Sequence, residues 1–228
     1  MKKLLAGLAV LSVAIFSAAA NTEIDLNFYS APLASYKLEQ NTDVELRPTA
    51  PFGFENQFGF YFGSPAKWLD IGLALSDGLD FNVGTKVYYK EKKQLSKDTS
   101  FGLSTYLTLG PAVRFNLGNM HSFFVSTGLG GSLSITEVPT IEYNSYNDDV
   151  EIESSNESII SLDYNLDLGY RIWIVNKTGF HFGFDVGYDL TLPLASISSY
   201  KKDIKGCEKH KIYFGIAFNF GDKSPDKF

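Results

Sequence analysis

Strict two-residue alternation over long stretches is the feature that most constrains this chain. Between residues 160 and 174, all eight even positions are Ile, Leu or Tyr, while the odd positions are Ser, Asp, Asn, Gly, Arg and one Trp. The pattern repeats between residues 180 and 194 with Phe, Val, Tyr and Leu. Successive side chains of a strand point to opposite faces, so the pattern predicts long strands with one apolar and one polar face.

The connections between such segments alternate in length. Short turns are predicted at 118–121 and 175–178, and longer polar connections separate the other strands. Tight turns at one end and long loops at the other are typical of a transmembrane β-barrel. We therefore predict an all-β fold, a transmembrane antiparallel up-and-down β-barrel of eight strands. The predicted strands cover residues 22–38, 49–63, 79–90, 100–117, 122–136, 158–174, 179–194 and 209–220.

Residues 64–78 leave a second strand count open. Ser64 and Pro65 suit the first positions of a short helix. The apolar residues between 69 and 75 instead alternate as in a strand, which would lengthen the third strand or give a barrel of ten strands. β-Bulges are expected at the three prolines inside predicted strands, Pro32, Pro111 and Pro193.

The composition of the two faces indicates which one points outward. The polar face is rich in Gly and Ser with scattered charges, which suits a narrow interior. The apolar face is rich in Phe and Leu and carries no charge over whole strands, which suits lipid better than water. A soluble lipocalin-like barrel would have the opposite arrangement. The mean hydropathy of −0.06 is thus an average over two interleaved sets of residues.

A charged network is predicted inside the barrel, because buried charges must pair or reach water. Acids outnumber bases in this set, which leaves two interpretations. The network either closes the interior as a structural element or lines a narrow path that favours cations. The inward charges are Asp25, Glu55, Asp80, Lys86, Arg114, Asp163, Asp167, Arg171, Asp185 and Asp189.

Residues 1–20 have the composition of a signal peptide. Lys2 and Lys3 precede an apolar run at 4–16, and small residues follow at 17–20. We predict cleavage before Asn21, a barrel over 21–220 and a periplasmic tail over 221–228.

Three segments resemble those of a known class of protein. Residues 110–115 (GPAVRF) and 167–171 (DLGYR) each run towards a tight turn. The final strand is similar to the signal by which the barrel-assembly machinery recognises its clients, through Tyr213, Gly215, Ile216, Phe218 and Phe220. The chain therefore resembles the small outer-membrane β-barrels of the OmpA, OmpX, OmpW and opacity-protein type. More loosely, it is similar to small spirochaetal barrels of undefined function.

The resemblance implies a monomer in the outer membrane of a diderm bacterium, with outer-membrane lipid and the barrel-assembly machinery as partners. Its implied role is structural, or binding of a host or extracellular ligand through four loops. The alternative is a narrow pore, or an OmpW-like passage for small apolar molecules. A lipid A-modifying enzyme is a more remote alternative, for which only His210 lies near outer serines.

Other functions find little support in the sequence. With 20 Lys and Arg against 26 Asp and Glu, the chain is not a nucleic-acid binder by charge. No cofactor, metal site or catalytic residue is assigned. The acidic segment 137–157 is expected either to fold across the barrel mouth against lysine-rich loops or to remain solvated. Cys207 is expected to be exposed in the last loop.

Overall fold

The structure is a computed structural model that describes residues 21–38, 44–66, 68–89, 93–98, 101–118, 120–144, 149–177, 179–198 and 204–221. Among these residues, no helix has the length and apolar character needed to cross a membrane. The predicted signal peptide and residues 222–228 of the predicted tail lie outside the described residues.

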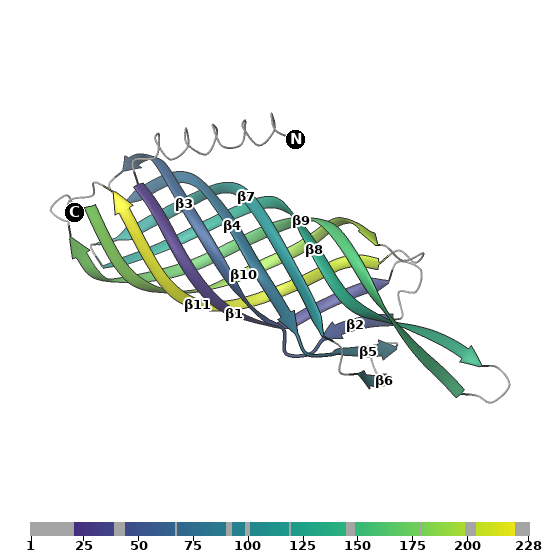
Figure 1. The fold of residues 1–228 in the computed structure, drawn as a ribbon. Coiled ribbons are helices and arrows are strands. Elements are labelled where there is room, and N and C mark those ends of the chain that lie inside the picture. Colours follow the sequence, from purple (N-terminus) through teal and green to yellow (C-terminus); the bar gives the residue numbers. More distant parts are fainter. Residues whose placement is uncertain are drawn as a thin grey trace, which may run out of the picture.

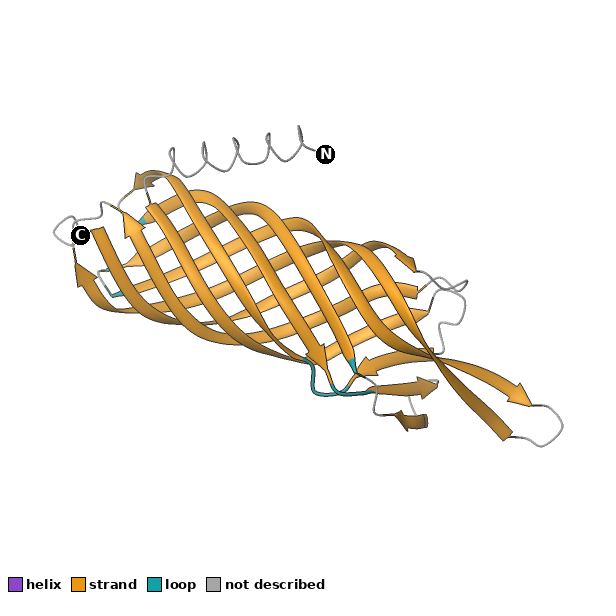
Figure 2. Cartoon of the chain, viewed as in Figure 1, coloured by secondary structure: helices purple, strands orange, loops and turns teal. Residues whose placement is uncertain are grey.

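Eight long strands form a closed antiparallel barrel (Figure 1), and nearly all of the described chain is strand (Figure 2). The last strand pairs with the first, so the wall has no open edge. The predicted fold class and the count of eight are confirmed, and the ten-strand alternative is wrong. The wall consists of β1 (Asn21–Leu38), β3 (Phe52–Ala66), β4 (Leu69–Asn82), β7 (Gly102–Leu117), β8 (His121–Asn144), β9 (Asp149–Lys177), β10 (Gly179–Ser198) and β11 (Ile204–Gly221).

The two ends of the barrel differ. At one end, which we call the turn end, β7 and β8 are joined by residues 118–120 and β9 and β10 by residue 178 alone. Asn21 and Gly221 pair with each other at this end. The opposite end, the loop end, carries the longer connections and most of the additional structure (Figure 1).

Three short strands form a small sheet at the loop end. β2 (Val44–Pro48) pairs with the end of β1, β5 (Thr85–Tyr89) pairs with β2, and β6 (Lys93–Asp98) pairs with β5. We call this the β2–β5–β6 sheet; it lies beside the mouth of the barrel (Figure 1).

The chain between residues 64 and 90 folds differently from the prediction. No helix begins at Ser64, because residues 64–66 are the end of β3. The third wall strand is Leu69–Asn82 rather than 79–90, and residues 85–89 form β5 outside the wall. The apolar alternation runs through both β4 and β5, so the period alone does not mark where the chain leaves the barrel.

Two of the three expected bulges are confirmed. The β1–β11 register shifts between Ser30 and Leu33, around Pro32, and the β9–β10 register shifts between Pro193 and Ala195. The expectation is wrong for Pro111, which lies opposite Leu73 of β4 in an unbroken register.

β8 and β9 project beyond the loop end as a long hairpin (Figure 1). Their pairing continues from Thr136 opposite Glu157 to Asn144 opposite Asp149. The described part of the acidic segment 137–157 therefore extends away from the barrel and does not fold across its mouth.

The two faces of the wall separate by polarity as predicted. Outward side chains are apolar and exposed, as in Leu107 (54% exposed) and Phe214 (61% exposed). Inward side chains are polar and buried, as in Asp25 and Asn165. This arrangement is that of a transmembrane barrel and the reverse of a soluble one.

Candidate functional site

The interior of the barrel holds many buried charged side chains. Glycines on the inward face leave room for larger side chains. A Cβ atom added at Gly169 would overlap the ring of Phe124, and one at Gly78 would overlap the ring of Tyr106. Small residues on some strands thus allow large side chains from facing strands to cross the interior.

The arginine layer occupies the half nearer the turn end. Arg171 on β9 forms ion pairs with Glu23 and Asp25 of β1. Arg114 on β7 forms ion pairs with Glu23 and, at 2.7 Å, with Asp70 of β4. Both arginines and their carboxylate partners are almost completely buried. These five residues, which define the layer, join four strands of the wall.

Aromatic rings support both guanidinium groups. The Arg171 guanidinium lies 3.7 Å from the centre of the Phe124 ring, and that of Arg114 lies 4.4 Å from the centre of the Tyr61 ring. Cations over aromatic faces gain further attraction when both are shielded from water.

The lysine layer occupies the half nearer the loop end. Lys209 on β11 forms an ion pair with Asp80 of β4. Lys211, also on β11, lies 3.3 Å from Asp189 of β10 and 3.6 Å from Glu55 of β3. These five residues define the layer, and Lys211 is only 1% exposed.

Hydrogen bonds around Asp167 of β9 extend the arginine layer along the interior. Gln57 donates to this carboxylate at 2.6 Å, and the Tyr213 hydroxyl donates at 2.8 Å. Arg171 in turn donates to the side-chain oxygen of Gln57 at 3.3 Å. Asp167, Gln57 and Tyr213 thus belong to the same hydrogen-bonded network as Arg171.

The structure places the predicted inward charges in different parts of the molecule. Glu55, Asp80 and Asp189 belong to the lysine layer, and Asp25, Arg114 and Arg171 belong to the arginine layer. Asp167 lies between the layers, Asp185 lies 3.9 Å from Arg171, and Asp163 is buried on β9. Lys86 differs from the expectation, because β5 lies outside the barrel wall.

Sequence reasoning missed four members of these layers. In β1, Glu23 lies two residues from Asp25 and therefore on the same face of the strand. In β11, Lys209 and Lys211 likewise alternate with the outward residues and share the face of Tyr213. Extending the alternation towards the ends of both strands would have found them. Asp70 was missed because residues 64–78 were not assigned to a strand.

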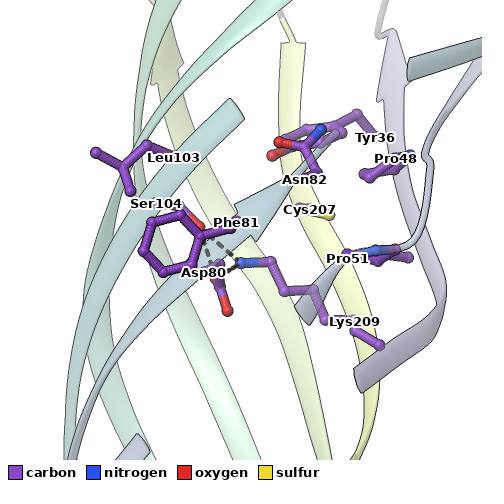
Figure 3. Close-up of a pocket in the computed structure, with 12 residues that line it drawn as sticks. Tyr36, Pro48, Pro51, Asp80, Phe81, Asn82, Leu103, Ser104, Cys207 and Lys209 are labelled. Atoms are coloured by element: carbon purple, nitrogen blue, oxygen red, sulfur yellow. Dashed lines mark hydrogen bonds and ion pairs between the residues drawn. The ribbon is translucent and has the colours of Figure 1, made fainter. Parts of the chain in front are cut away.

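A pocket lies in the wall at the loop end, near the start of β3 (Figure 3). Its lining includes the inward residues Asp80, Ser104 and Lys209 and the outward residues Phe81 and Leu103. Lys209 donates to Ser104 at 3.1 Å, and Ser104 donates to Asp80 at 2.6 Å. Residues of the inward and of the outward face thus both line this pocket.

Cys207 also lines this pocket and is buried, so the expectation of an exposed thiol is wrong. It precedes the lysine layer on β11, where the strand extends further than predicted.

His210 lies on β11 with the opposite parity to Lys209 and Lys211. Its Nδ1 atom lies 2.6 Å from the Tyr188 hydroxyl, and its Nε2 atom lies 3.3 Å from Glu208. Ser196, one of the outer serines near His210, accepts a hydrogen bond from the Gly206 amide. Within the described part of the chain, no group of three or more His, Cys, Asp or Glu residues is arranged to hold a metal ion.

The residues of the expected assembly signal lie on β11. Phe218 and Phe220 share the outward face of this strand, and Tyr213 and Gly215 share the inward face. β11 pairs with both β10 and β1, so it is the strand that closes the barrel.

Comparison with protein-family models finds no match. Comparison with curated protein sequences finds none either. The fold is similar to that of Neisserial surface protein A (NspA), with a TM-score of 0.50 and 8% identity over 86% of this chain and 95% of that one. It is also similar to the outer membrane protein OprG from Pseudomonas aeruginosa, with a TM-score of 0.50 and 11% identity over 90% of this chain and 97% of that one. The chain therefore has the fold of the small outer-membrane β-barrels, the class that its sequence pattern resembles.

Proposed function

We propose that this protein is an outer-membrane barrel whose interior is closed by the arginine and lysine layers. Its role is structural, or it binds an extracellular or host ligand through the connections at the loop end. The supporting observation is that Arg171 and Arg114 reach carboxylates on other strands across the interior. An eight-stranded barrel is just wide enough for side chains to fill.

The apolar outward face of the wall and the difference between the two ends of the barrel support the proposed location in the outer membrane. Exposed Leu, Phe and Ile side chains on the wall strands suit the hydrocarbon of a bilayer. We propose that the loop end faces the exterior and the turn end faces the periplasm. Residues 1–20 direct export and are removed before Asn21, and β11 carries the signal for the barrel-assembly machinery. The closed wall fits a monomer.

Ion conductance across a planar bilayer tests the closed interior. We expect no current steps from the wild-type barrel, and current through the double variant Arg114→Ala, Arg171→Ala. The outward variant Leu107→Ala is the matched control and should remain closed. Cation-selective current from the wild type would contradict the closed interior and support the narrow cation path.

The wall pocket favours one second candidate, a passage for small apolar molecules. Residues of both faces line the pocket, Phe81 and Leu103 from the outward set and Ser104 and Lys209 from the inward set. In this case the barrel should accelerate uptake of an apolar dye into vesicles, and Leu103→Trp should reduce the rate. Equal rates with and without the protein would exclude the passage.

We assign no catalytic residue. His210 is the residue on which the enzyme alternative depends, and its described contacts are with Tyr188 and Glu208. We therefore expect His210→Ala to leave the lipid composition of the membrane unchanged.

A further inference from the structure

Gly215 of β11 leaves room on the inward face of the wall. In register, it lies between Asn27 of β1 and Asp185 of β10. A Cβ atom added at Gly215 would overlap Oδ1 of Asn27 and would lie 2.8 Å from Oδ1 of Asp185. The two polar side chains therefore converge over the glycine from the strands on either side.

Both of these side chains are buried without the hydrogen bonds that they can make. Asn27 and Asp185 are each 3% exposed. Neither atom of the Asn27 amide and neither oxygen of Asp185 has a hydrogen-bond partner in another residue of the described structure. The nearest base, Arg171, has its Nε atom 3.9 Å from Oδ2 of Asp185, which is beyond hydrogen-bond distance. Buried polar groups without partners are costly, so the convergence of two such side chains favours a bound polar ligand.

Two neighbouring carboxylates add oxygen atoms of the same kind. Asp25 lies two residues from Asn27 on the same face of β1, and Glu55 of β3 lies opposite Asn27. Within the described chain, Oδ1 of Asp25 and Oε1 of Glu55 have no hydrogen-bond partner. The unpartnered groups around Asn27 are therefore mainly oxygen atoms, which are the ligands that hard cations prefer.

The ion pairs around this site leave an excess of negative charge. Two bases make these pairs with five acids: Arg171 pairs with Glu23, Asp25 and Asp185, and Lys211 pairs with Glu55 and Asp189. Arg114 also pairs with Glu23, but it shares its charge with Asp70. A buried negative charge is costly unless a cation balances it, so the site favours a positive ligand.

We propose that the closed interior holds one alkali metal ion, Na⁺ or K⁺, between Asn27 and Asp185 over Gly215. Oxygen atoms of these two side chains are its direct ligands, and water completes its coordination. Among the described residues, no group of three or more His, Cys, Asp or Glu is arranged to hold a metal ion, so we assign a monovalent ion rather than Ca²⁺. This inference rests on the closed interior proposed above and adds a ligand to it.

The stability of the refolded barrel in two kinds of salt tests the proposal. Barrels in lipid vesicles are unfolded in urea at constant ionic strength, while NaCl or KCl replaces N-methylglucamine chloride, whose cation is too large for the site. A ligand that binds only the folded state lowers the equilibrium constant for unfolding in proportion to its concentration once the site is filled. We expect this constant to fall about tenfold for each tenfold rise in Na⁺ or K⁺ above the dissociation constant.

Two asparagine variants separate the ion from the rest of the interior. Asn27→Ala removes an amide that has no partner, so it should change the stability in N-methylglucamine chloride little and abolish the dependence on the alkali ion. Asn219→Ala is the matched control, because Asn219 is 2% exposed and donates to Glu23 at 3.1 Å. This variant should be less stable in both kinds of salt and keep the wild-type dependence on the alkali ion.

Three results would overturn the proposal. One is equal stability of the wild type in alkali and N-methylglucamine salts. Another is an alkali dependence that persists in Asn27→Ala, which would place the ion elsewhere. The third is a stability that rises as the pH falls and is the same in both kinds of salt, which would assign the balancing charge to protons.

Conductance across a planar bilayer tests the closed interior separately. A barrel that carries no current and shows no alkali dependence contradicts only this inference. Cation current through the wild type contradicts the proposed function instead.

Discussion

The arginine layer and the lysine layer follow the same plan with different cations. In the arginine layer, Arg171 lies over the ring of Phe124, and that ring occupies the space beside Gly169. Phe124 has no polar group, so the guanidinium itself makes the contacts to Glu23 and Asp25.

In the lysine layer, the Lys211 ammonium lies 3.9 Å from the centre of the Tyr106 ring, which occupies the space beside Gly78. Here the ring is a tyrosine, and its hydroxyl donates to Glu55. A second lysine, Lys209, pairs with Asp80 of β4, as Arg114 pairs with Asp70 of the same strand in the arginine layer.

The difference follows from the chemistry of the two cations. A guanidinium is planar and presents five donors, so one arginine holds carboxylates in two directions. An ammonium is a compact charge without this planar fork, and Lys211 lies farther from Asp189 and Glu55 than Arg171 lies from Glu23 and Asp25. We infer that the arginine layer contributes more than the lysine layer to the stability of the barrel.

The largest effect is expected for Arg171→Met. Removing one member of a buried ion pair leaves its partners charged and uncompensated, which costs about 3–5 kcal/mol. The measurement is the free energy of unfolding in urea for barrels refolded into lipid vesicles, followed by the fluorescence of Trp173 and Trp68. The outward variant Ile172→Val is the control and should change the stability little. A loss below about 1 kcal/mol in Arg171→Met would contradict the ranking of the two layers.

A smaller loss is expected for Lys211→Met in the same assay. Its contacts to Asp189 and Glu55 are 3.3 and 3.6 Å long, and Lys209 remains in the layer. We expect a loss of about 2–3 kcal/mol, typical of interactions with a charged partner. If Lys211→Met destabilises the barrel more than Arg171→Met, the lysine layer is the stronger of the two.

The smallest of the three effects is expected for Gly169→Ala. The added methyl group would overlap the Phe124 ring and displace it from beneath Arg171. Overpacking of this kind should cost about 1–2 kcal/mol. Gly131→Ala is the matched control, because its nearest neighbour, the Ser161 carbonyl oxygen, lies 3.6 Å from the added atom. If Gly169→Ala and Gly131→Ala lower the free energy of unfolding equally, the Phe124 ring moves aside without cost.

Much of the wall was predictable, because alternation is a local property of each strand. The residues from 160 to 174 belong to β9, and their inward and outward faces agree with the predicted ones. The limits of the strands were less predictable, since neighbouring strands rather than local pattern decide how far pairing continues. β8 and β9 extend to Asn144 and Asp149 because they pair with each other beyond the rest of the wall.

The candidate site was predictable only in part. The two-residue alternation predicts that the side chains of Arg171 and Asp167 face the interior of the barrel, and both are buried there. Lys86 has a suitable parity as well, but it lies on a sheet that has left the wall. No local signal distinguishes these cases, because β5 has the same alternation as a barrel strand.

The two-residue period alone shows that this chain forms a two-faced wall of long strands with charge on one face, because it fixes the orientation of each side chain. Which of these charges form pairs depends instead on how the strands assemble. Glu23 and Arg171 are far apart in the sequence and become partners because closure of the barrel brings β1 and β9 to facing sides of a narrow interior. Pairing across a lumen depends on strand register and stagger around the whole barrel, and no single strand carries that information.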